Sequence, residues 1–273
     1  MCGYAGFLTN SISKDIEMNN ILDGMSSELI HRGPDDQGSW VDINDGIAMG
    51  FCRLAILDLS SAGHQPMTSK SGRFVITYNG EIYNYKEFGD YKSDGYCLID
   101  LYKEHGVDFV KKLDGEFAIL LLDFYNDLIL MVTDPFKTKP LFYSNADGHF
   151  GCSTYRTALD KVNHRDVKKA KPNTAMIFKI SDATFVREFT VCEFDLNQHK
   201  DNFDDWTKAF ENSIFKRTHD TTQNIFIGLS SGYDSGAICC ELLKQDVPFK
   251  AYSVLTPIIV HENTRIVEER QEL

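Results

Sequence analysis

Met1-Cys2-Gly3-Tyr4-Ala5-Gly6-Phe7 begins the chain, and this stretch predicts both a strand and a catalytic group. Removal of the initiator methionine would leave Cys2 as the first residue, with a thiol nucleophile and a free α-amine on one residue. The α-amine has an ordinary pKa of roughly 7.7 to 8.0, so it can serve as the base for the thiol without a histidine partner. Glycines mixed with apolar residues suit a buried strand that a ligand approaches closely. The alternative is that Cys2 is only a small residue that follows methionine.

The composition indicates a globular protein that works on small molecules. The 273 residues are 42% hydrophobic and 25% charged, which suits one large domain or one and a half ordinary ones. A net charge of -12 argues against partners such as nucleic acid or anionic membranes. The seven cysteines form no C-x-x-C pair, so neither a disulfide framework nor a metal site is expected. No targeting or membrane-spanning segment is evident, which predicts a cytoplasmic location.

Short strands with few helices between them predict an α+β fold. Helices between antiparallel strands suggest two packed sheets with helices outside. The strands are expected at residues 46–51, 55–57, 74–78, 117–123, 128–133, 141–144, 149–152, 175–180 and 185–189, and the helices at residues 13–30, 82–88 and 97–105.

The composition changes near residue 195, where an acidic, polar stretch is expected as a linker. Asn202 or Asp204 could cap a helix that carries aromatic and aliphatic residues on one face. Residues 225–229, 237–244 and 249–255 then read as strand, helix and strand, which is one βαβ unit of a parallel sheet. The predicted domains are residues 2–195 and 196–273.

Asn79-Gly80 offers a side-chain amide next to a backbone N–H at the end of an apolar strand. Such a pair can stabilise a developing oxyanion. An Asn-Gly pair is also the strongest short signal for a β-turn, and the dipeptide alone favours that interpretation.

Four further polar residues are candidates for binding or structure. Arg53 is a single arginine in an apolar stretch, where a guanidinium grips a carboxylate of the protein or of a ligand, and the structural ion pair is favoured. Asp94 could bind an ammonium group or cap a helix, and capping is the commoner use. His31 and His64 are interpreted as structural, because a cysteine activated by its own amine needs neither.

Several motifs occur in an order that resembles the glutaminase domain of glutamine-dependent asparagine synthetases, which are class II (N-terminal-nucleophile) amidotransferases. The resemblance covers roughly residues 2–190 and implies a four-layer αββα sandwich. The motifs are Cys2-Gly3, His31-Arg32-Gly33-Pro34-Asp35, Arg53-Leu54-Ala55-Ile56, Asp58-Leu59-Ser60, Gln65-Pro66-Met67, Tyr78-Asn79-Gly80-Glu81-Ile82-Tyr83-Asn84, Asp114-Gly115-Glu116-Phe117-Ala118, Asp134-Pro135-Phe136 and Lys139-Pro140-Leu141.

The resemblance implies a role for each matching residue. Cys2 would attack the side-chain amide of glutamine, with Asn79 and Gly80 as the oxyanion hole. A thioester would form, and water would hydrolyse it to release glutamate. No cofactor is implied for this reaction. The implied substrate-binding residues are Arg53 for the α-carboxylate, with Leu54 and Ile56 beside it, and Asp94 with Glu81 for the α-ammonium.

A second motif, Ser230-Ser231-Gly232-Tyr233-Asp234-Ser235-Gly236, lies at a predicted strand-to-helix junction. Such a junction binds anions, although ordinary βα turns can also have this composition. The motif resembles the pyrophosphate loop of the same family, which implies that the second domain is the start of an α/β ATP-pyrophosphatase-like domain taking ATP and magnesium. The implied ligands are Ser230, Ser231, Gly232, Asp234 and Ser235.

The sequence departs from the family pattern at six positions in four places. Ser231 replaces a glycine, which would be strained if the backbone there needed a positive φ. Gly236 stands where the family has a second serine, Lys137-Thr138 where it has Gly-Ile, and Gly95-Tyr96 where it has Thr-Glu. None of these changes affects the nucleophile or the oxyanion donors.

The synthetase portion is expected to be incomplete, because few residues follow the first strand of the second domain and one βαβ unit cannot cover a parallel sheet. It would dock on the first domain, be completed by a second polypeptide, or mark a truncated gene. We therefore expect an asparagine-synthetase-like glutaminase that supplies ammonia to an acceptor, aspartate in full-length relatives, and that does not make asparagine alone. The alternatives are a stand-alone N-terminal-nucleophile amidase and a non-catalytic regulator that binds nucleotide or glutamine.

Overall fold

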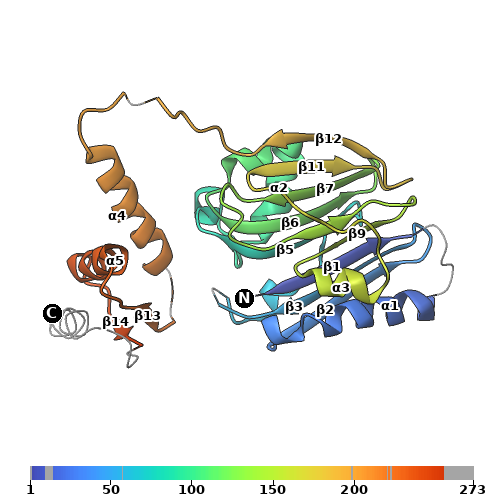
Figure 1. The fold of residues 1–273 in the computed structure, drawn as a ribbon, viewed down its shortest axis with the longest axis horizontal. Coiled ribbons are helices and arrows are strands. Elements are labelled where there is room, and N and C mark those ends of the chain that lie inside the picture. The colour runs from blue at the N-terminus through green and yellow to red at the C-terminus, as the bar shows by residue number, and fades with distance from the viewer. Residues whose placement is uncertain are drawn as a thin grey trace. The chain divides into compact units, whose positions relative to one another are not determined.

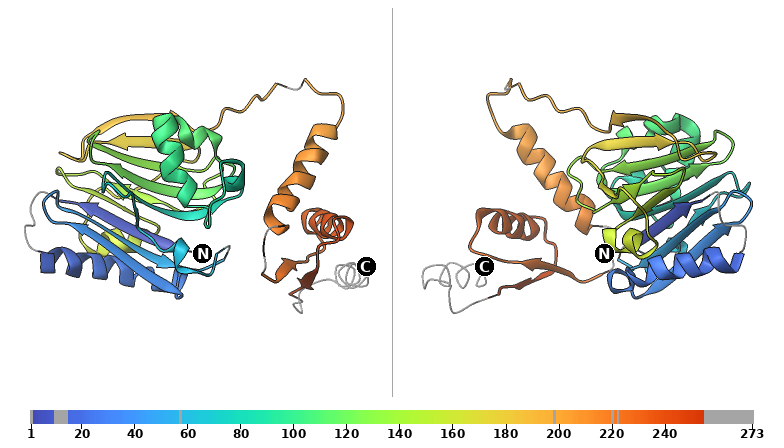
Figure 2. Two further views of the ribbon diagram at one scale, coloured as in Figure 1. Left: turned by 180° about the vertical axis from the view of Figure 1, so that it is seen from behind. Right: turned by 45° about the vertical axis from the view of Figure 1, so that its right-hand side comes forward.

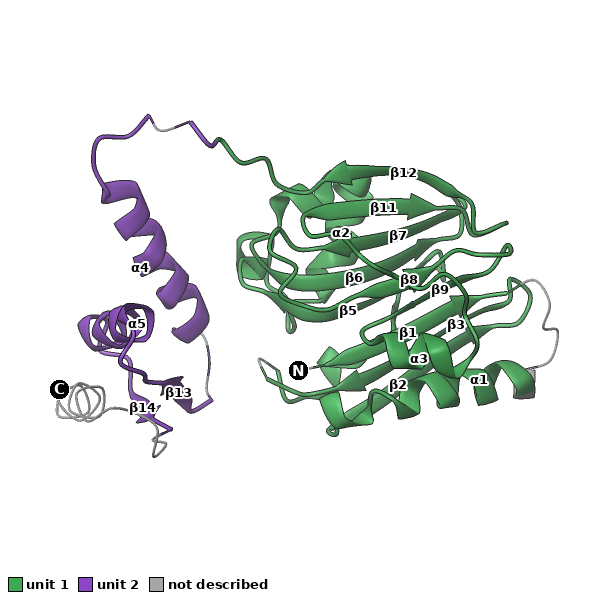
Figure 3. Cartoon of the chain, in the orientation of Figure 1, with its two compact units in different colours: residues 1–195 green, residues 196–273 purple. Residues whose placement is uncertain are grey.

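The computed structural model describes residues 2–9, 15–56, 58–197, 199–219, 221 and 223–254. It divides into two compact units, Met1–Asp195 and Leu196–Leu273, which are considered separately (Figure 3).

Unit 1 contains two six-stranded sheets whose paired strands are all antiparallel. The first sheet has the order β10-β8-β9-β1-β3-β2 and the second the order β12-β11-β7-β6-β5-β4. The strands of the first sheet are β1 (Gly3–Leu8), β2 (Asp36–Asp42), β3 (Ile47–Arg53), β8 (Phe142–Ser144), β9 (Phe150–Ser153) and β10 (Lys168–Lys169). Those of the second are β4 (Met67–Thr68), β5 (Phe74–Ile82), β6 (Gly115–Asp123), β7 (Leu128–Thr133), β11 (Thr174–Phe178) and β12 (Phe185–Thr190).

Helices cover the outer face of each sheet, which makes four layers. Apolar residues of α1 (Asp15–Ser27) and α3 (Arg156–Lys161) pack on β1 and β3 of the first sheet. Residues of α2 (Tyr96–His105) and the following 3-10 turn, Gly106–Lys112, pack on the second sheet. A third cluster fills the space between the sheets. Figures 1 and 2 show this order of helix, sheet, sheet and helix, and the predicted αββα sandwich is confirmed.

The alternation of side chains along the central strands decides which groups enter the space between the sheets. On β1, Tyr4 and Leu8 belong to the inter-sheet core, so Cys2 lies on the same side, against that core. On β5, Val75 faces the inter-sheet core while Tyr78 and its alternate neighbours face α2. The odd-numbered residues at the end of β5 therefore point toward the first sheet.

Several local predictions were wrong. Ala55 and Ile56 are not in a strand, and Leu57 lies outside the described residues. The helix predicted at residues 82–88 is replaced by the end of β5, which includes Ile82, and by a short 3-10 turn, Tyr85–Glu87. Strand β2 and helix α3 were not predicted.

Unit 2 consists of α4 (Asp204–Thr218), β13 (Ile225–Gly228), α5 (Tyr233–Lys244) and β14 (Phe249–Tyr252). The two strands pair in parallel, so the predicted βαβ unit is present. Helix α5 begins at Tyr233, earlier than predicted, and the expected end of the last strand at Leu255 lies outside the described residues. Phe203 occupies the N-cap position of α4 and makes no side-chain capping bond, but the Asn202 Oδ1 accepts a hydrogen bond from the Asp204 N–H at 3.1 Å, so the capping prediction is confirmed in part for Asn202 and was wrong for Asp204.

None of the helices in the described part of the chain is long and apolar enough to cross a membrane.

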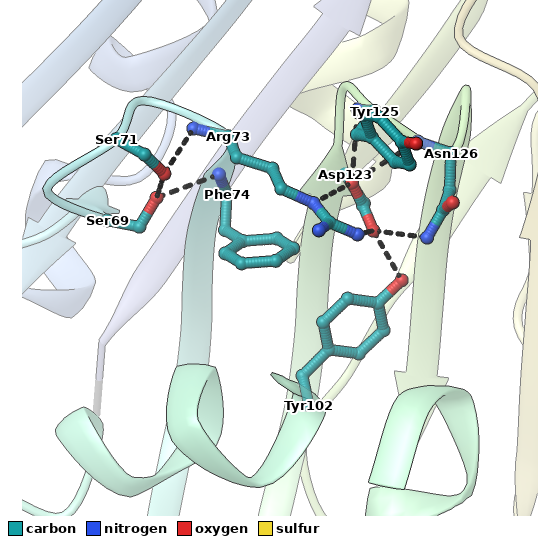
Figure 4. Close-up of polar contacts among 8 residues, drawn as sticks. All are labelled: Ser69, Ser71, Arg73, Phe74, Tyr102, Asp123, Tyr125 and Asn126. Carbon is teal, nitrogen blue, oxygen red and sulfur yellow. Dashed lines mark hydrogen bonds and ion pairs between the residues drawn. The ribbon is translucent and has the colours of Figure 1, made fainter. Parts of the chain in front are cut away.

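A polar network connects α2 to the residue before β5 and to the last residue of β6 (Figure 4). The Asp123 carboxylate is fully buried and accepts two hydrogen bonds of 2.9 Å from Arg73. It also accepts hydrogen bonds from the Tyr102 hydroxyl at 3.1 Å and from the Asn126 amide at 2.7 Å. Burial raises the pKa of Asp123, but the bonds from Arg73 and Tyr102 outweigh it, so the pKa lies below its ordinary value.

The variant Asp123→Ala should lower the melting temperature of unit 1 by roughly 5 to 10 °C, because buried donors lose their acceptor. Scanning calorimetry or circular dichroism measures the change. The control is Asp100→Ala, which removes an exposed ion pair with Lys103 and should have little effect. Because the folded pKa of Asp123 is lowered, its contribution is present above the unfolded pKa of about 3.9 and is lost as the pH falls through the folded pKa. Equal losses in the two variants at neutral pH would contradict this account.

Candidate active site

The Cys2 thiol lies directly before β1 and contacts the backbone just beyond the neighbouring strand β3. Its Sγ is 3.4 Å from the Leu54 carbonyl oxygen, to which it can donate, and the Leu54 N–H donates to Sγ at 3.3 Å. Burial raises the pKa of the thiol, the bond from Leu54 lowers it, and the nearby Glu81 carboxylate raises it again. The net pKa is raised, so the resting group is a neutral thiol that needs a base to activate it.

Arg32 holds the backbone of the cysteine in place. Its Nε donates to the Cys2 carbonyl oxygen at 2.8 Å, and its Nη1 donates to the Tyr155 hydroxyl at 2.6 Å. The His31 ring stacks on Tyr155 with the ring centres 5.5 Å apart. His31 therefore has a structural role here, as predicted from the sequence, and Arg32 is a supporting residue that the sequence reasoning missed.

Asn79 and Gly80 lie within β5, opposite Ala118 and Phe117 of β6, so the turn interpretation was wrong. The Asn79 side chain is on the inter-sheet side, the residue is 1% exposed, and the side-chain Nδ2 has no hydrogen-bond partner. A buried amide donor without an acceptor costs free energy, which a ligand oxygen would recover. Asn79 thus has the property that an oxyanion-hole donor requires.

The Gly80 N–H points to the edge of β5 that β6 does not occupy. Backbone N–H groups two residues apart on a strand point to the same side, and the Tyr78 and Ile82 N–H groups on this edge donate to Gln65 and Asp94 side chains. Gly80 lies between these two bonds. Its φ is +153°, and a Cβ there would lie 1.9 Å from the Glu116 carbonyl oxygen, so no other residue fits without a backbone shift.

Arg53 ends β3 on the inter-sheet side, next to Cys2. Its guanidinium is buried and donates to the carbonyl oxygens of Asp58 and Ser60, the latter at 2.6 Å. Gly63 lies against it, since a Cβ there would be 2.1 Å from Nη2. No carboxylate pairs with Arg53 among the described residues, so the structural ion pair favoured from the sequence is not found there. Neutral carbonyl partners leave its positive charge available for an anionic ligand.

Glu81 and Asp94 place carboxyl groups on either side of β5. Glu81 is on the inter-sheet side with Asn79, and its pKa is raised to about 8, first by burial and then by Asp94. Asp94 is buried on the α2 side, where it accepts hydrogen bonds from the Tyr78 hydroxyl at 2.6 Å and from the Ile82 N–H at 2.8 Å. Helix α2 begins after Gly95 with no side-chain capping bond, so the capping interpretation of Asp94 was wrong.

The remaining predicted residues of unit 1 lie outside this cluster of side chains. Leu54 contributes its backbone groups to Cys2. Ile56 is 43% exposed on the segment that follows. His64 is paired with Asp36 at 2.7 Å on the surface, which agrees with its structural interpretation.

The loop of unit 2 connects β13 to α5 and is held by its own hydroxyl groups. The Ser235 Oγ accepts from the Ser230 N–H at 3.1 Å, and the Ser230 Oγ accepts from the Gly232 N–H at 3.1 Å. Ser231 is not at a positive φ, so the strain considered for this serine does not arise. Asp234 is exposed in the first turn of α5, where the N–H groups lack intrahelical acceptors.

A family model described as a glutamine amidotransferase domain matches residues 1–193. Asparagine synthetase [glutamine-hydrolyzing] 2 of Bacillus subtilis (strain 168) is 39% identical over 153 residues, covering 53% of this chain and 20% of that protein. Putative asparagine synthetase [glutamine-hydrolyzing] 1 of Methanocaldococcus jannaschii is 28% identical over 297 residues, covering 89% of this chain and 53% of that protein. The chain thus spans about a fifth to a half of these curated relatives.

Among solved structures, a glutamine phosphoribosylpyrophosphate amidotransferase from B. subtilis, complexed with ADP and GMP, has a similar fold. The TM-score is 0.57 at 15% sequence identity, and the match covers 96% of this chain and 68% of that one. At this identity the likeness concerns the fold alone. The four-layer αββα arrangement of unit 1 agrees with the fold that the resemblance implied.

Proposed function

Because the chain belongs to the glutamine amidotransferase family, we propose that unit 1 hydrolyses glutamine to glutamate and ammonia with Cys2 as nucleophile. The single observation that supports this best is the buried Asn79 Nδ2 without an acceptor, on the same inter-sheet side as the Cys2 thiol. Oxyanion stabilisation requires a donor of this kind, which is an amide N–H that is already in position when the charge develops on the substrate oxygen.

In the proposed reaction the α-amine of Cys2 takes the thiol proton as the sulfur attacks the side-chain amide carbon of glutamine. Asn79 Nδ2 and the Gly80 N–H would stabilise the oxyanion of the tetrahedral intermediate. The C–N bond then breaks, the nitrogen leaves as ammonia with the proton returned by the amine, and a thioester remains. Water attacks the thioester to give glutamate and the free thiol.

The charges around the thiol suit the two ends of an α-amino acid. Arg53, held by neutral carbonyl groups, would bind the α-carboxylate, and Glu81 with Asp94 would supply negative charge for the α-ammonium. A general amidase would not need both a cation for an α-carboxylate and carboxylates for an α-ammonium. Ammonia release from glutamine, compared with release from simple amides without the α-substituents, tests this proposal. Equal rates would favour the amidase, and glutamine binding without turnover would favour the regulator.

The acceptor of the ammonia is proposed by analogy with the relatives, whose names describe asparagine synthetases. The loop of unit 2 would bind the phosphates of ATP through the N–H groups at the start of α5. Magnesium, when bound, would be held by the Asp234 carboxylate, because carboxylate oxygens are ligands that this ion prefers. We also propose that a second polypeptide completes unit 2.

ATP with magnesium should raise the melting temperature of the wild-type chain, and Asp234→Ala should remove most of the increase. The increase at saturating ligand is expected to be a few degrees, measured by differential scanning fluorimetry. Asp201→Ala, which removes an exposed carboxylate before α4, is the matched control and should keep the response. An equal response in all three proteins would contradict the assignment of Asp234.

A further inference from the structure

Glu81 belongs to a cluster of charged side chains at the end of the second sheet. It lies directly opposite Glu116 in the ladder between β5 and β6. Opposed residues of an antiparallel pair project to the same side, with Cβ atoms about 4.5 to 5.5 Å apart, and like charges in this position repel. Two carboxylates therefore face the space between the sheets next to each other, and Asp94 lies behind β5.

Lys139 brings one positive charge into this cluster. Its Nζ is 3.0 Å from the Glu116 Oε2, and its side chain is 10% exposed, whereas that of Glu116 is 34% exposed. An ammonium that is buried to this degree needs a carboxylate partner. The ion pair with Glu116 therefore holds the Lys139 ammonium close to β6.

The backbone that carries Lys139 is attached to the same strand. The buried Asp134 carboxylate accepts a hydrogen bond from the Phe117 N–H at 3.1 Å and bonds from the Thr138 N–H and hydroxyl at 3.0 and 2.6 Å. Phe117 is the residue after Glu116, and Thr138 is the residue before Lys139. The position of Lys139 relative to Glu116 is thus set by the fold rather than by a flexible surface contact.

The groups that act on Glu81 come from several elements. Its pKa is raised to about 8: burial has the largest effect, the charges of Asp94 and Glu116 also raise the pKa, and Lys139 lowers it. The Cys2 thiol of β1 is the titratable group across the inter-sheet space, and the raised pKa of Cys2 is partly due to Glu81. Arg53 at the end of β3 also acts on Cys2, and Tyr78 on β5 is bonded to Asp94. Two cations favour the ionised form of Glu81, Lys139 and, with a smaller effect, the N-terminal ammonium.

We propose that Lys139, paired with Glu116, is a positioning residue that favours the ionised form of Glu81, which binds the α-ammonium of glutamine. This inference rests on the proposed function and assigns to Lys139 an effect on substrate binding rather than on bond breaking. An ionised Glu81 is needed for the ammonium, so glutamine should bind more tightly as the pH rises toward 8.

The test is the pH dependence of kcat and KM for glutamine hydrolysis between pH 6.5 and 8.5, in the full chain and three variants. Lys139→Met removes the charge and keeps the length of the side chain. It should raise KM about tenfold at pH 7, the effect of one unit in the pKa of Glu81, and leave kcat within about twofold. Lys139→Arg keeps the charge and should restore KM.

Glu116→Gln is the decisive variant, because the proposal predicts that it changes KM in the direction opposite to Lys139→Met. It removes the like charge opposite Glu81 and keeps the Lys139 ammonium, so KM at pH 7 should fall and its pH profile should move to lower pH. If the ion pair only stabilised the fold, Lys139→Met and Glu116→Gln would weaken glutamine hydrolysis to the same extent. Equal rises of KM in Lys139→Met and Glu116→Gln, or a loss confined to kcat, would overturn the proposal. Absence of ammonia release from the wild type would instead contradict the proposed function.

Discussion

Cys2→Ala should reduce glutamine hydrolysis by at least about 10⁴-fold in kcat, because the reaction loses the atom that forms the thioester. No other group among the described residues can replace it. The Cys52 thiol, which is close along the sheet, is buried, with a pKa raised to about 11, and it belongs to the cluster on the other face of the first sheet. The loss should appear in kcat, while glutamine still binds through the charged side chains.

The measurement is the release of ammonia and glutamate at saturating glutamine, together with the intact mass of each protein. The mass shows whether Met1 has been removed, as the α-amine mechanism requires. Cys240→Ala, which removes an exposed thiol of unit 2, is the matched control and should hydrolyse glutamine at the wild-type rate. Equal rates in wild type and Cys2→Ala would exclude the proposed nucleophile, and full activity in protein that retains Met1 would exclude the α-amine of Cys2 as its base.

Asn79→Ala should lower kcat by about 10² to 10³-fold, which corresponds to roughly 2.7 to 4 kcal/mol of lost oxyanion stabilisation. KM for glutamine should change little, because this donor acts on the charge that develops in the transition state. The stability of the fold should hardly change, since the Nδ2 of Asn79 has no partner to lose.

Asn84→Ala provides a control with the opposite expectation. Asn84 is also a buried amide in the same stretch, but its Nδ2 donates to the Lys112 carbonyl oxygen at 2.9 Å and its Oδ1 accepts from the Asp114 N–H at 2.9 Å. Its loss should therefore lower the melting temperature and leave kcat close to that of the wild type. If Asn79→Ala were as destabilising as Asn84→Ala and kept its activity, Asn79 would be a structural residue.

Strands were predictable where burial on one face makes apolar and polar residues alternate. They were less predictable where a side chain, rather than a neighbouring strand, accepts the hydrogen bond of a backbone N–H. Residues 55–57 read as a strand, but the Leu54 N–H donates to the Cys2 thiol and the Ala55 N–H to the Asp35 carboxylate, so the ladder ends at Arg53. The helix expected at residue 82 does not form, because β5 continues through Ile82 and the Ile82 N–H donates to Asp94. These bonds join residues far apart in the sequence, and a local pattern contains no signal for them.

The candidate residues themselves were named from the sequence, but their roles could not be separated there. A turn and an oxyanion hole look alike in an Asn-Gly pair, and an ion pair and a carboxylate-binding site look alike in a single arginine. The structure distinguishes them by what each side chain contacts: Asn79 has an unpaired buried donor, and Arg53 is held by carbonyl oxygens. Arg32 had no distinguishing signal beyond its place in a motif, because its partners are the Cys2 carbonyl and Tyr155.

By itself, the sequence determined that a cysteine begins an apolar strand, that the fold is α+β with a separate βαβ unit, and which motifs accompany the cysteine. These properties depend on residue type and on periodicity, which are local. Only the tertiary structure decided that Cys2, Arg53, Asn79 and Glu81 face one space between two sheets, and that Glu116 and Lys139 stand beside them. Charge and burial at a site depend on distances between strands that are remote in the chain, and those distances exist only once the two sheets have packed.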